Sequence, residues 1–318
     1  MERGLRLPPA FRERLALQLG EAESARVLAA LGEKHARVLR VNRSATTPAD
    51  LGAELAAAGF EVEPAPKPFG DALVVRGGRL RDLQAAPAHV EGRFHLQSLA
   101  CMSAVLVLDP QPGESILDLS AAPGAKAGQI AHAMQLRGRL VANERGTKRA
   151  GKLRAALAAQ GVDDFVTLAT DKSGALARRE AGTFDRVLVA APSSSEARFH
   201  LDQETSWADW KPSKLSRLAS DQRKLLMAAV SALRPGGVLV YWTDTFAPEE
   251  NEVALHKLLR RFDGELDLVP PPVVLPGERP ALTRWADRNL DPRLKHARLL
   301  LPRGPMDGGF VARLEKAL

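Results

Sequence analysis

The sequence predicts a doubly wound α/β domain with a mostly parallel sheet, preceded by a small α+β domain. Two observations support this fold class. From residue 93 onward, short apolar strands alternate with amphipathic helices, as in a series of β-α-β units. Residues 1–92 instead combine helices with a few extended segments and lack this alternation. We therefore expect two domains, at residues 1–92 and 93–318.

Apolar spacing and glycine stops define the elements of the first domain. We expect helices at residues 8–20, 22–32 and 47–59 and extended segments at 35–44 and 60–66. Residues 71–80 predict a hairpin with a Gly-Gly turn. Arg40 lies in the 35–44 strand with an arginine three residues to either side. This trio suits phosphate binding and equally suits a solvated face of a sheet.

In the second domain the strands and helices follow one another in the order of a doubly wound sheet. We expect strands at residues 114–120, 138–144, 165–171, 184–192 and 238–245. We expect helices at residues 127–136, 147–161 and 220–237. Sheets of this kind bind ligands at the carboxyl ends of their strands, so the functional residues are sought there.

Charge and composition narrow the classes of partner and of site. The formal net charge of +7 suits a polyanionic partner, although a generally basic surface explains it equally well. No uninterrupted apolar run reaches the ~20 residues of a membrane span, and residues 1–15 contain no apolar signal core. The single cysteine, Cys101, excludes an internal disulfide and a cysteine metal cluster. We expect a cytoplasmic protein that binds neither membrane nor metal.

Three acidic residues end three successive strands of the second domain. They are Asp118, Glu144 and Asp171. The first strand leads into a helix through a turn with a glycine, which permits close approach of a ligand, and the amino end of that helix favours a carboxylate or phosphate. An acid at the end of the second strand can accept hydrogen bonds from both hydroxyls of a ribose. The pattern predicts nucleoside binding, with three ordinary strand caps as the alternative. The turn comprises Ala121, Ala122, Pro123, Gly124, Ala125 and Lys126.

Five segments of the second domain carry a resemblance to a known family. They read "HLQSLACMSAVLVLDPQPGESILDLSAAPGAKAGQIA", "GRLVANERGTKRAGKL", "FDRVLVAAPSSSEA", "LRPGGVLVYWTDTFAPEENE" and "GPMDGGFVARL". In this order and at these intervals they are similar to the RsmB/RsmF-type, or Sun-domain, RNA cytosine-C5 methyltransferases. The similarity runs from about Arg93 to the end, and "RVLRVNRS" resembles the small domain that precedes the catalytic domain in this family.

The resemblance implies a fold, a cofactor and a partner. The fold is a Rossmann-like class I S-adenosylmethionine (SAM) methyltransferase domain, and the cofactor is SAM. The expected partner is RNA, either transfer RNA or, preferably, ribosomal RNA or a ribosomal particle. The residues that the resemblance places in the SAM site are Asp118, Ala121 to Lys126, Glu144, Arg149 and Asp171.

The chain departs from the family at the positions that carry its chemistry. The family uses a cysteine thiolate that adds to carbon-6 of cytosine, a second cysteine that assists release of the product, and an aspartate that contacts the base. The matching positions here are Asp244 for the nucleophile, Ser193 for the release cysteine and Ala190 for the aspartate. A serine needs a neighbouring base to become nucleophilic, and a carboxylate is a weak nucleophile toward a pyrimidine. Cys101 lies in an apolar helix and is expected to be a small core residue.

Cations interleaved with tryptophans indicate where RNA would bind. Basic residues cluster at 145–154, 211–217 and 284–298, and Trp207, Trp210 and Trp285 lie in or beside the last two clusters. Such surfaces stack on unpaired bases and neutralise phosphates. For the first cluster, the solvated face of a helix is the preferred interpretation, and for the other two it is RNA contact. The candidate RNA contacts are Arg40, Lys211, Lys214, Arg284 and Arg288.

The sequence leaves three functions open. The first is a SAM- and RNA-binding member of the family that has lost the cysteine chemistry, a pseudo-methyltransferase. The second is an active RNA methyltransferase in which Asp244 orients or deprotonates an exocyclic amine or a hydroxyl, so that another atom is methylated. The third is a methyltransferase for small molecules or proteins on the same scaffold, which RNA affinity would argue against.

Overall fold

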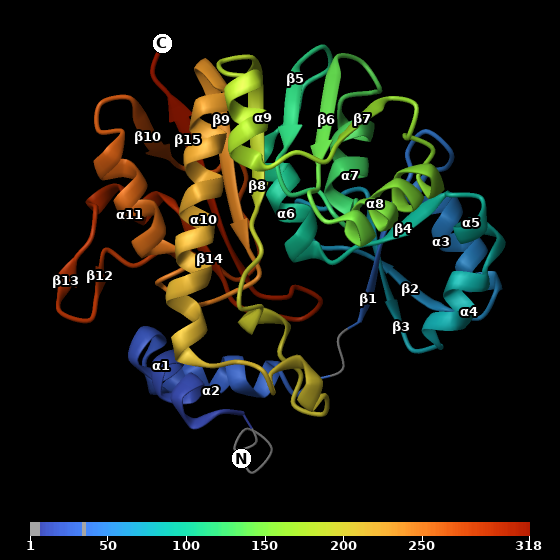
Figure 1. Cartoon of the computed structure of the whole chain (residues 1–318). Helices are drawn as coiled ribbons and strands as arrows, with labels where there is room; N and C mark the ends of the chain where they lie inside the picture. Colours follow the sequence, from blue (N-terminus) through green and yellow to red (C-terminus); the bar gives the residue numbers. More distant parts are fainter. Residues whose placement is uncertain (1–6, 34–35) are drawn as a thin grey trace.

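The computed structural model describes residues 7–33 and 36–318 of the chain. A small antiparallel sheet lies beside a large mixed sheet, and helices cover both faces of the large sheet (Figure 1). His35, the first residue of the strand expected at 35–44, lies outside the described residues. Among the described residues, no helix is both long and apolar enough to cross a membrane.

The small sheet has four antiparallel strands in the order β2-β3-β1-β4. Its last strand lies beyond residue 92 and pairs with β1 through Leu96 and Leu39. The division of the chain at residue 92 stays a prediction. The elements of this part are β1 (Arg37–Val41), α3 (Pro48–Ala57), β2 (Glu61–Pro64), β3 (Ala72–Arg76), α4 (Leu80–Ala85), α5 (Pro87–Val90) and β4 (Phe94–Leu96).

The hairpin expected at residues 71–80 is wrong. β3 ends at Arg76, and Gly77 and Gly78 lead into the short helix α4 rather than into a second strand. Both glycines adopt positive φ angles, 68° and 62°, so they do reverse the chain. A two-glycine turn signals this reversal, but it does not determine which element follows. The strands that pair with β3 are β2 and β1.

The large sheet confirms the doubly wound fold. Its order is β11-β14-β15-β9-β8-β5-β6-β7, with β10 paired to β15, and the five strands from β9 to β7 are parallel. The remaining strands extend it as an antiparallel edge. Its strands are β5 (Ser115–Asp118), β6 (Arg139–Asn143), β7 (Val166–Ala169), β8 (Phe184–Ala190), β9 (Leu233–Thr243), β10 (Leu266–Val269), β11 (Glu278–Pro280), β14 (Arg298–Leu300) and β15 (Gly309–Lys316).

The helix expected at residues 220–237 is shifted. It starts earlier, because Pro212 lies in the first turn where proline is well tolerated, and it ends at Ala232, where β9 begins. The helices of this part are α6 (Leu99–Leu108), α7 (Ala125–Ala133), α8 (Thr147–Ala159), α9 (Ser173–Arg179), α10 (Pro212–Ala232) and α11 (Glu252–Arg261). The short 3-10 helices are η2 (Glu196–Arg198), η3 (Glu204–Ser206) and η4 (Pro292–His296), and a separate hairpin joins β12 (Arg284–Trp285) to β13 (Arg288–Asn289).

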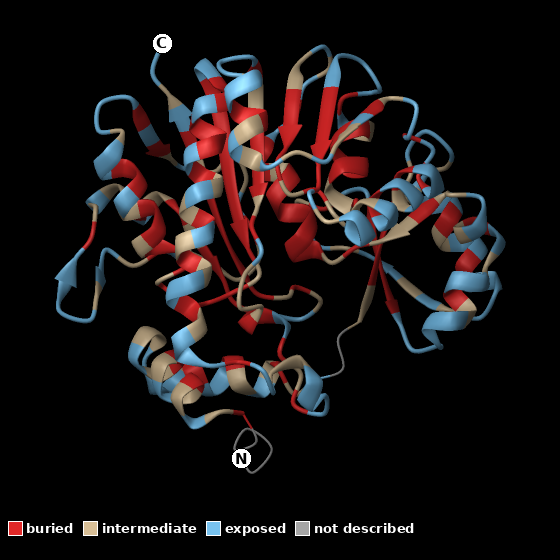
Figure 2. Ribbon diagram, viewed as in Figure 1, coloured by how far each residue is buried: buried red, intermediate tan, exposed pale blue. Residues whose placement is uncertain are grey.

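The parallel strands are buried along most of their length (Figure 2), and alternate residues of these strands belong to two separate cores. Leu117 and Val187 pack with α9, α10 and α11, whereas Ile116 and Leu188 pack with α6, α7 and α8. Both faces of each strand are therefore covered, which is why the strands read as continuous apolar runs in the sequence. Burial on both faces fixes the carboxyl ends of the strands, where the site lies.

The first two helices, α1 (Pro9–Leu19) and α2 (Glu21–Ala30), pack on the second domain rather than on the small sheet. The ring of Phe11 lies 5.0 Å from that of Phe199 and 5.7 Å from that of Trp210, measured between centroids. This aromatic cluster packs α1 against the loop after β8. The N-terminal helices therefore stabilise that loop, although they contribute no residue to the cavity described below.

Candidate active site

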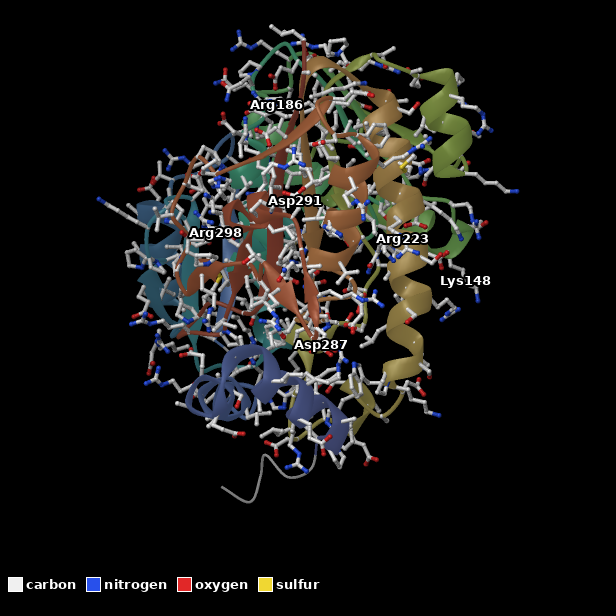
Figure 3. All side chains as sticks on the ribbon, turned by 90° about the vertical axis from the view of Figure 1, so that its left-hand side faces the viewer. Lys148, Arg186, Arg223, Asp287, Asp291 and Arg298 are labelled. Atoms are coloured by element: carbon white, nitrogen blue, oxygen red, sulfur yellow. The ribbon has the colours of Figure 1, made fainter. Side chains whose placement is uncertain are left out.

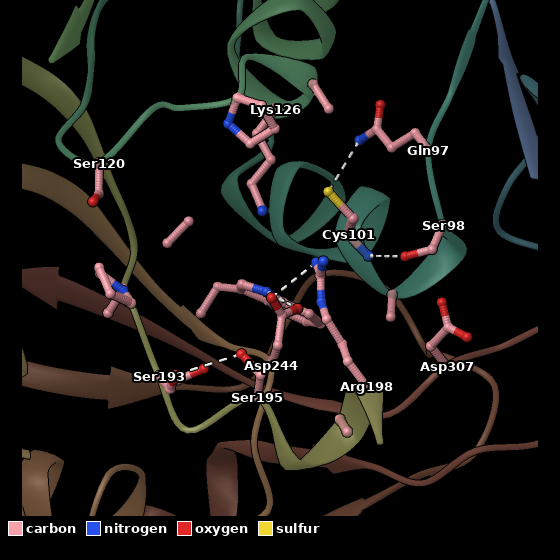
Figure 4. Close-up of a pocket in the computed structure, with 18 of the residues that line it drawn as sticks. Gln97, Ser98, Cys101, Ser120, Lys126, Ser193, Ser195, Arg198, Asp244 and Asp307 are labelled. Carbon is pink, nitrogen blue, oxygen red and sulfur yellow. Dashed lines mark hydrogen bonds and ion pairs between the residues drawn. The ribbon is translucent and has the colours of Figure 1, made fainter. Parts of the chain in front are cut away.

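A cavity of about 660 Å³ opens at the carboxyl ends of β5, β8 and β9 (Figure 4). Its walls include the start of α6, the turn before α7, the loop after β8 and the residue after β9, together with Arg149 of α8 and residues 307–308 before β15. It lies where doubly wound sheets bind their ligands. The lining residues used below are Gln97, Cys101, Asp118, Ala121, Ala122, Pro123, Ala125, Lys126, Arg149, Ala190, Ser193, Arg198 and Asp244.

Asp118 is the buried acid of the cofactor side. Its side chain is 0 % exposed; one carboxylate oxygen accepts a hydrogen bond of 3.4 Å from the Ser120 amide, and the other has no partner. Burial is the main cause that raises the pKa of Asp118 to about 6. An unpaired buried carboxylate oxygen costs free energy unless a ligand supplies a donor. Asp118 is therefore suited to a ligand with a cationic or hydrogen-bond-donating group.

The turn before α7 brings the backbone close to this acid. Gly124 has a φ of 117°, and a Cβ atom added there would lie 3.1 Å from side-chain atoms of both Leu153 and Ala156. Both the positive φ and the close approach of α8 require glycine at this position. α7 begins directly after it, and no side chain caps the helix, so the N–H groups of its first turn have no partner within the helix and could bind a carboxylate or phosphate.

Glu144 and Asp171 follow the next two strands but do not line the cavity itself. Glu144 is 6 % exposed; its carboxylate accepts a 2.9 Å hydrogen bond from the Gly146 amide and forms a 3.2 Å ion pair with Arg149. Asp171 forms a 2.9 Å ion pair with Arg179, whose hydrogen bond lowers the pKa of Asp171. Of the ten predicted cofactor residues, Gly124, Glu144 and Asp171 lie outside the lining, and the other seven form one wall of it.

The loop after β8 carries serines in the position of the expected release cysteine. The hydroxyl of Ser193 makes no hydrogen bond to a described residue, and its carbonyl accepts one from Ser195. Ser194 is tightly held: its amide donates to Glu250 at 3.0 Å and its hydroxyl lies 2.7 Å from that of Thr245. No base is therefore in contact with the Ser193 hydroxyl within the described chain.

Asp244 follows β9, and both of its carboxylate oxygens are engaged. One accepts a 3.1 Å hydrogen bond from the indole N–H of Trp242, and the other lies 2.9 Å from the guanidinium of Arg198. The carboxylate thus points across the cavity to the loop after β8, as Figure 4 shows. Because a cation and an N–H donor already hold its two oxygens, neither oxygen can attack a base without breaking one of these contacts.

Cys101 was expected in the core, and the structure places it at the edge of the cavity. It is buried, at 8 % exposed, yet it lines the cavity, and its sulfur accepts a 3.7 Å contact from the Gln97 amide. Lys126 and Arg198 face it in Figure 4. Burial would lower the pKa of Lys126, but the facing Cys101 and Asp244 outweigh burial and raise it, so the lysine is charged. The apolar sequence of α6 correctly predicted that Cys101 is buried, but it did not indicate that the first turn of this helix lines a cavity.

The expectation that Arg40 contacts RNA is corrected. Arg40 is 4 % exposed and donates hydrogen bonds to Gln97 at 2.9 Å and Gln160 at 2.5 Å, with His132 at 3.0 Å. Burial lowers its pKa to about 10, so it remains charged at neutral pH. Burial and the charge of Arg40 lower the pKa of His132 to about 4, so the neutral ring can accept the hydrogen bond. Arg40 therefore joins the small sheet to the α7–α8 region of the large domain.

The other four candidate RNA contacts lie on the surface and outside the cavity. Lys211 and Lys214 lie at the start of α10, and Arg284 and Arg288 lie on the β12–β13 hairpin. Trp210, beside the first pair, is buried, and its indole N–H donates to Glu196 at 2.9 Å, so it is not available to stack on a base. RNA contact by the four cations stays a prediction.

Sequence reasoning missed Arg198, the counter-charge of Asp244. A carboxylate in a half-buried position requires a cation, but nothing in the spacing of the chain indicates which one. Among the described residues, no group of three or more His, Cys, Asp or Glu side chains is placed to hold a metal ion. The expectation that the protein uses no metal stays a prediction.

The fold and the site together define the class of SAM-dependent methyltransferases. The orphaned oxygen of Asp118, the glycine turn and the acid at the end of β6 fit SAM, and the family match confirms the expected cofactor. Residues 105–315 match the sequence model of the family described as "16S rRNA methyltransferase RsmB/F", and the chain belongs to this family.

Relatives and solved structures agree with this assignment. The tRNA (cytosine(49)-C(5))-methyltransferase of Pyrococcus abyssi is 34 % identical over 81 % of this chain and 81 % of its own length. Ribosomal RNA small subunit methyltransferase F of Serratia proteamaculans is 30 % identical over 98 % of this chain but 63 % of its own length, so the chain spans about three fifths of that relative. A solved methyltransferase homologue from Pyrococcus horikoshii is 28 % identical, with a TM-score of 0.83 over 99 % of this chain and 98 % of that one.

Proposed function

We propose that this protein binds SAM and RNA and does not methylate carbon-5 of cytosine by the cysteine mechanism. The observation that carries the proposal is the 2.9 Å ion pair between Asp244 and Arg198, at the position where the family resemblance implies the nucleophilic cysteine. The names of two relatives describe enzymes that act on transfer RNA and on small-subunit ribosomal RNA, which supports RNA as the ligand. Ribosomal RNA or a ribosomal particle is the partner we expect.

The cofactor side of the cavity has the groups needed to hold SAM. Asp118 and Lys126 line the cavity, where Asp118 would accept from a donor group of the ligand and Lys126 would contact its carboxylate. Glu144 lies just outside the lining and would accept from the ribose hydroxyls of a ligand that reaches the end of β6. When bound, SAM supplies an electrophilic methyl group. Arg149 lies between the turn and β6, bonded to Ala122 at 3.2 Å, and would close this wall over the nucleoside.

The chemical side lacks the groups that would make cytosine react. A carbon nucleophile must first be generated at carbon-5 by addition of a thiolate to carbon-6, and no cysteine lies after β8 or β9. Asp244 is a weak nucleophile, and Arg198 further neutralises it. Ser193 has no neighbouring base, and Ala190 has no polar group to contact the base. Each of the three family roles is therefore unfilled at its own position.

Calorimetry and a radioactive transfer assay test the two halves of this proposal. S-adenosylhomocysteine should bind the purified protein, and Glu144→Gln should weaken binding by about tenfold, since loss of a charge-assisted hydrogen bond costs about 1.4 kcal/mol. The exposed Glu265→Gln is the matched control and should bind normally. With tritiated SAM and small-subunit ribosomal RNA, no label should enter cytosine. Labelled 5-methylcytidine would contradict the proposal.

A second candidate function is methylation of a different RNA atom. The observation that favours it is the intact cofactor wall facing a carboxylate, Asp244, which could accept a proton from an exocyclic amine or a hydroxyl. Under this alternative, Asp244→Ala abolishes transfer and leaves SAM affinity unchanged. Transfer that persists in that variant would exclude Asp244 as the base.

A further inference from the structure

A second groove, of about 950 Å³, lies between α11 and the β12–β13 hairpin, and it shares no lining residue with the active-site cavity. Figure 1 shows the hairpin projecting beside α11 at the lower left, and Figure 3 views this side of the molecule with Asp287 at the hairpin tip. The groove residues are Glu249, Val253, His256, Lys257, Arg260, Arg261, Trp285, Ala286, Arg288, Asn289 and Leu290.

Trp285 is a fixed aromatic wall of this groove. Its indole N–H donates to Glu249 at 3.3 Å, and the guanidinium of Arg14 lies 5.5 Å from the ring centroid. Arg14 also pairs with Glu249, so α1, the hairpin and the segment before α11 hold the ring together. The side chain is half-buried against the core of the large domain. An aromatic ring that is already immobile loses little further entropy when it binds a flat ligand.

Four cations around the groove have no counter-charge. Lys257, Arg260, Arg261 and Arg288 form no ion pair or hydrogen bond with any described residue, and they are exposed. The one lining carboxylate, Glu249, is already paired with Arg14. Burial and the charges of Arg260 and Lys257 lower the pKa of His256, whose ring accepts from the Asp291 amide at 3.1 Å. The groove is therefore a concentrated positive site with an aromatic wall.

A purely structural explanation accounts for only part of this arrangement. Arg260 and Arg261 lie in the last turn of α11, where cations complement the negative end of the helix. The helix gives no reason for Arg288, which projects from the hairpin on the other side of the groove. Four like charges without partners repel one another, and a ligand with several negative charges would relieve this repulsion.

We propose that this groove binds a single-stranded segment of RNA, with an unpaired base stacked on Trp285 and phosphates paired with the cations of α11 and Arg288. Flat aromatic walls beside cations are typical of surfaces that bind single strands, because every base has a face to stack and every nucleotide a phosphate. An acidic protein would use the cations but not the aromatic wall. The inference rests on the proposed RNA binding and adds a second contact, separate from the active-site cavity.

The test is anisotropy titration of a fluorescein-labelled, mixed-sequence single-stranded RNA of about 20 nucleotides, at several salt concentrations. Arg260→Ala/Arg261→Ala should weaken binding and reduce the slope of log affinity against log salt by about 1.4, the value for two phosphate contacts on a single strand. The matched control is Arg26→Ala/Lys224→Ala, which removes two exposed cations that are already ion-paired. The control should keep the wild-type slope.

Trp285 is tested separately because its loss could disturb the hairpin. Trp285→Ala should weaken RNA binding by about 5- to 150-fold, whereas Trp285→Phe should retain most of the affinity because it keeps a stacking face. Binding of S-adenosylhomocysteine should be the same in all variants. A duplex of the same sequence should compete poorly.

Each contrary outcome has its own meaning. If the wild-type protein binds no RNA, the RNA half of the proposed function fails together with this inference. If the wild type binds but the groove variants behave like the control, the inference alone is overturned. Poly-glutamate of the same total charge as the RNA is the last competitor. If it displaces the RNA, and if Trp285→Ala changes neither the affinity for RNA nor that for poly-glutamate, the groove is a site for an acidic protein and the inference is also overturned.

Discussion

The guanidinium of Arg198 lies 2.9 Å from the carboxylate of Asp244, and the two residues come from the loops after β8 and β9. This ion pair occupies the part of the cavity where a reactive thiol would be needed. A backbone hydrogen bond also joins the two loops, since the Ala197 amide donates to the Asp244 carbonyl at 3.1 Å. Under our proposal, the pair stands where the family resemblance implies the groups that attack a base, and the seven cofactor residues that line the cavity form its opposite wall.

Restoring the family residues should restore chemistry. The triple variant Ala190→Asp, Ser193→Cys, Asp244→Cys places a thiol beside Arg198, and a nearby cation favours the thiolate. We expect 5-methylcytidine to appear in ribosomal RNA incubated with this variant and SAM, measured by nucleoside mass spectrometry. The matched variant with Ser at position 244 should remain inactive. If the triple variant folds and binds SAM but stays inactive, methylation of carbon-5 requires further residues that this chain lacks.

Labelling of the single cysteine should report on the cavity. Cys101 is the only thiol in the chain and lines the cavity that we assign to SAM. At a concentration of S-adenosylhomocysteine about 100 times its Kd, about one site in a hundred is empty, and reaction with iodoacetamide should slow accordingly. The rate is followed by mass spectrometry. An unchanged rate under saturating ligand would place the cofactor elsewhere.

Arg40 should matter for stability and not for RNA affinity. Arg40→Met leaves the acceptors on Gln97 and Gln160 buried without a donor, and we expect a loss of about 2–5 kcal/mol in the free energy of unfolding. Urea unfolding measures the loss. Arg43→Met, which removes an exposed ion pair with Asp71, should cost less than about 1 kcal/mol. A stable Arg40→Met protein with weakened RNA binding would reinstate Arg40 as an RNA contact.

Glu252 should make the protein less stable as the pH rises. Burial raises the pKa of this fully buried carboxyl to about 7, and one of its oxygens has no partner. Between pH 4.5 and 7 the folded state holds a proton that the unfolded state has released, so stability falls through this range, by about 3 kcal/mol at most for this group. Glu252→Gln should reduce the difference between urea midpoints at pH 5 and pH 8. Part of the pH dependence should remain in Glu252→Gln, because burial also raises the pKa of Glu196 to about 7.

The fold and the cofactor wall could be predicted because their signals are local. Apolar residues on both faces of β5 and β8 follow directly from burial between two helical layers, and a glycine between a strand and a helix has few uses other than a tight turn. The position of Asp118 follows from the same pattern, because the carboxyl ends of parallel strands meet at one edge.

The remaining features depend on packing between distant segments. The sequence placed Arg40 in an extended segment, but it could not show that the large domain covers this side chain. The pairing of Arg198 with Asp244 depends on the path of two loops. Trp285 was expected near RNA, whereas the cations of α11 that complete its groove lie more than twenty residues earlier in the chain and were not among the expected RNA contacts.

The most direct test is nucleoside mass spectrometry of ribosomal and transfer RNA from the organism that carries this gene, with and without the gene. The account predicts that the level of 5-methylcytidine is the same in both strains. Loss of 5-methylcytidine at one site, restored by the intact gene, would contradict the account and show that the Asp244–Arg198 pair belongs to a working enzyme.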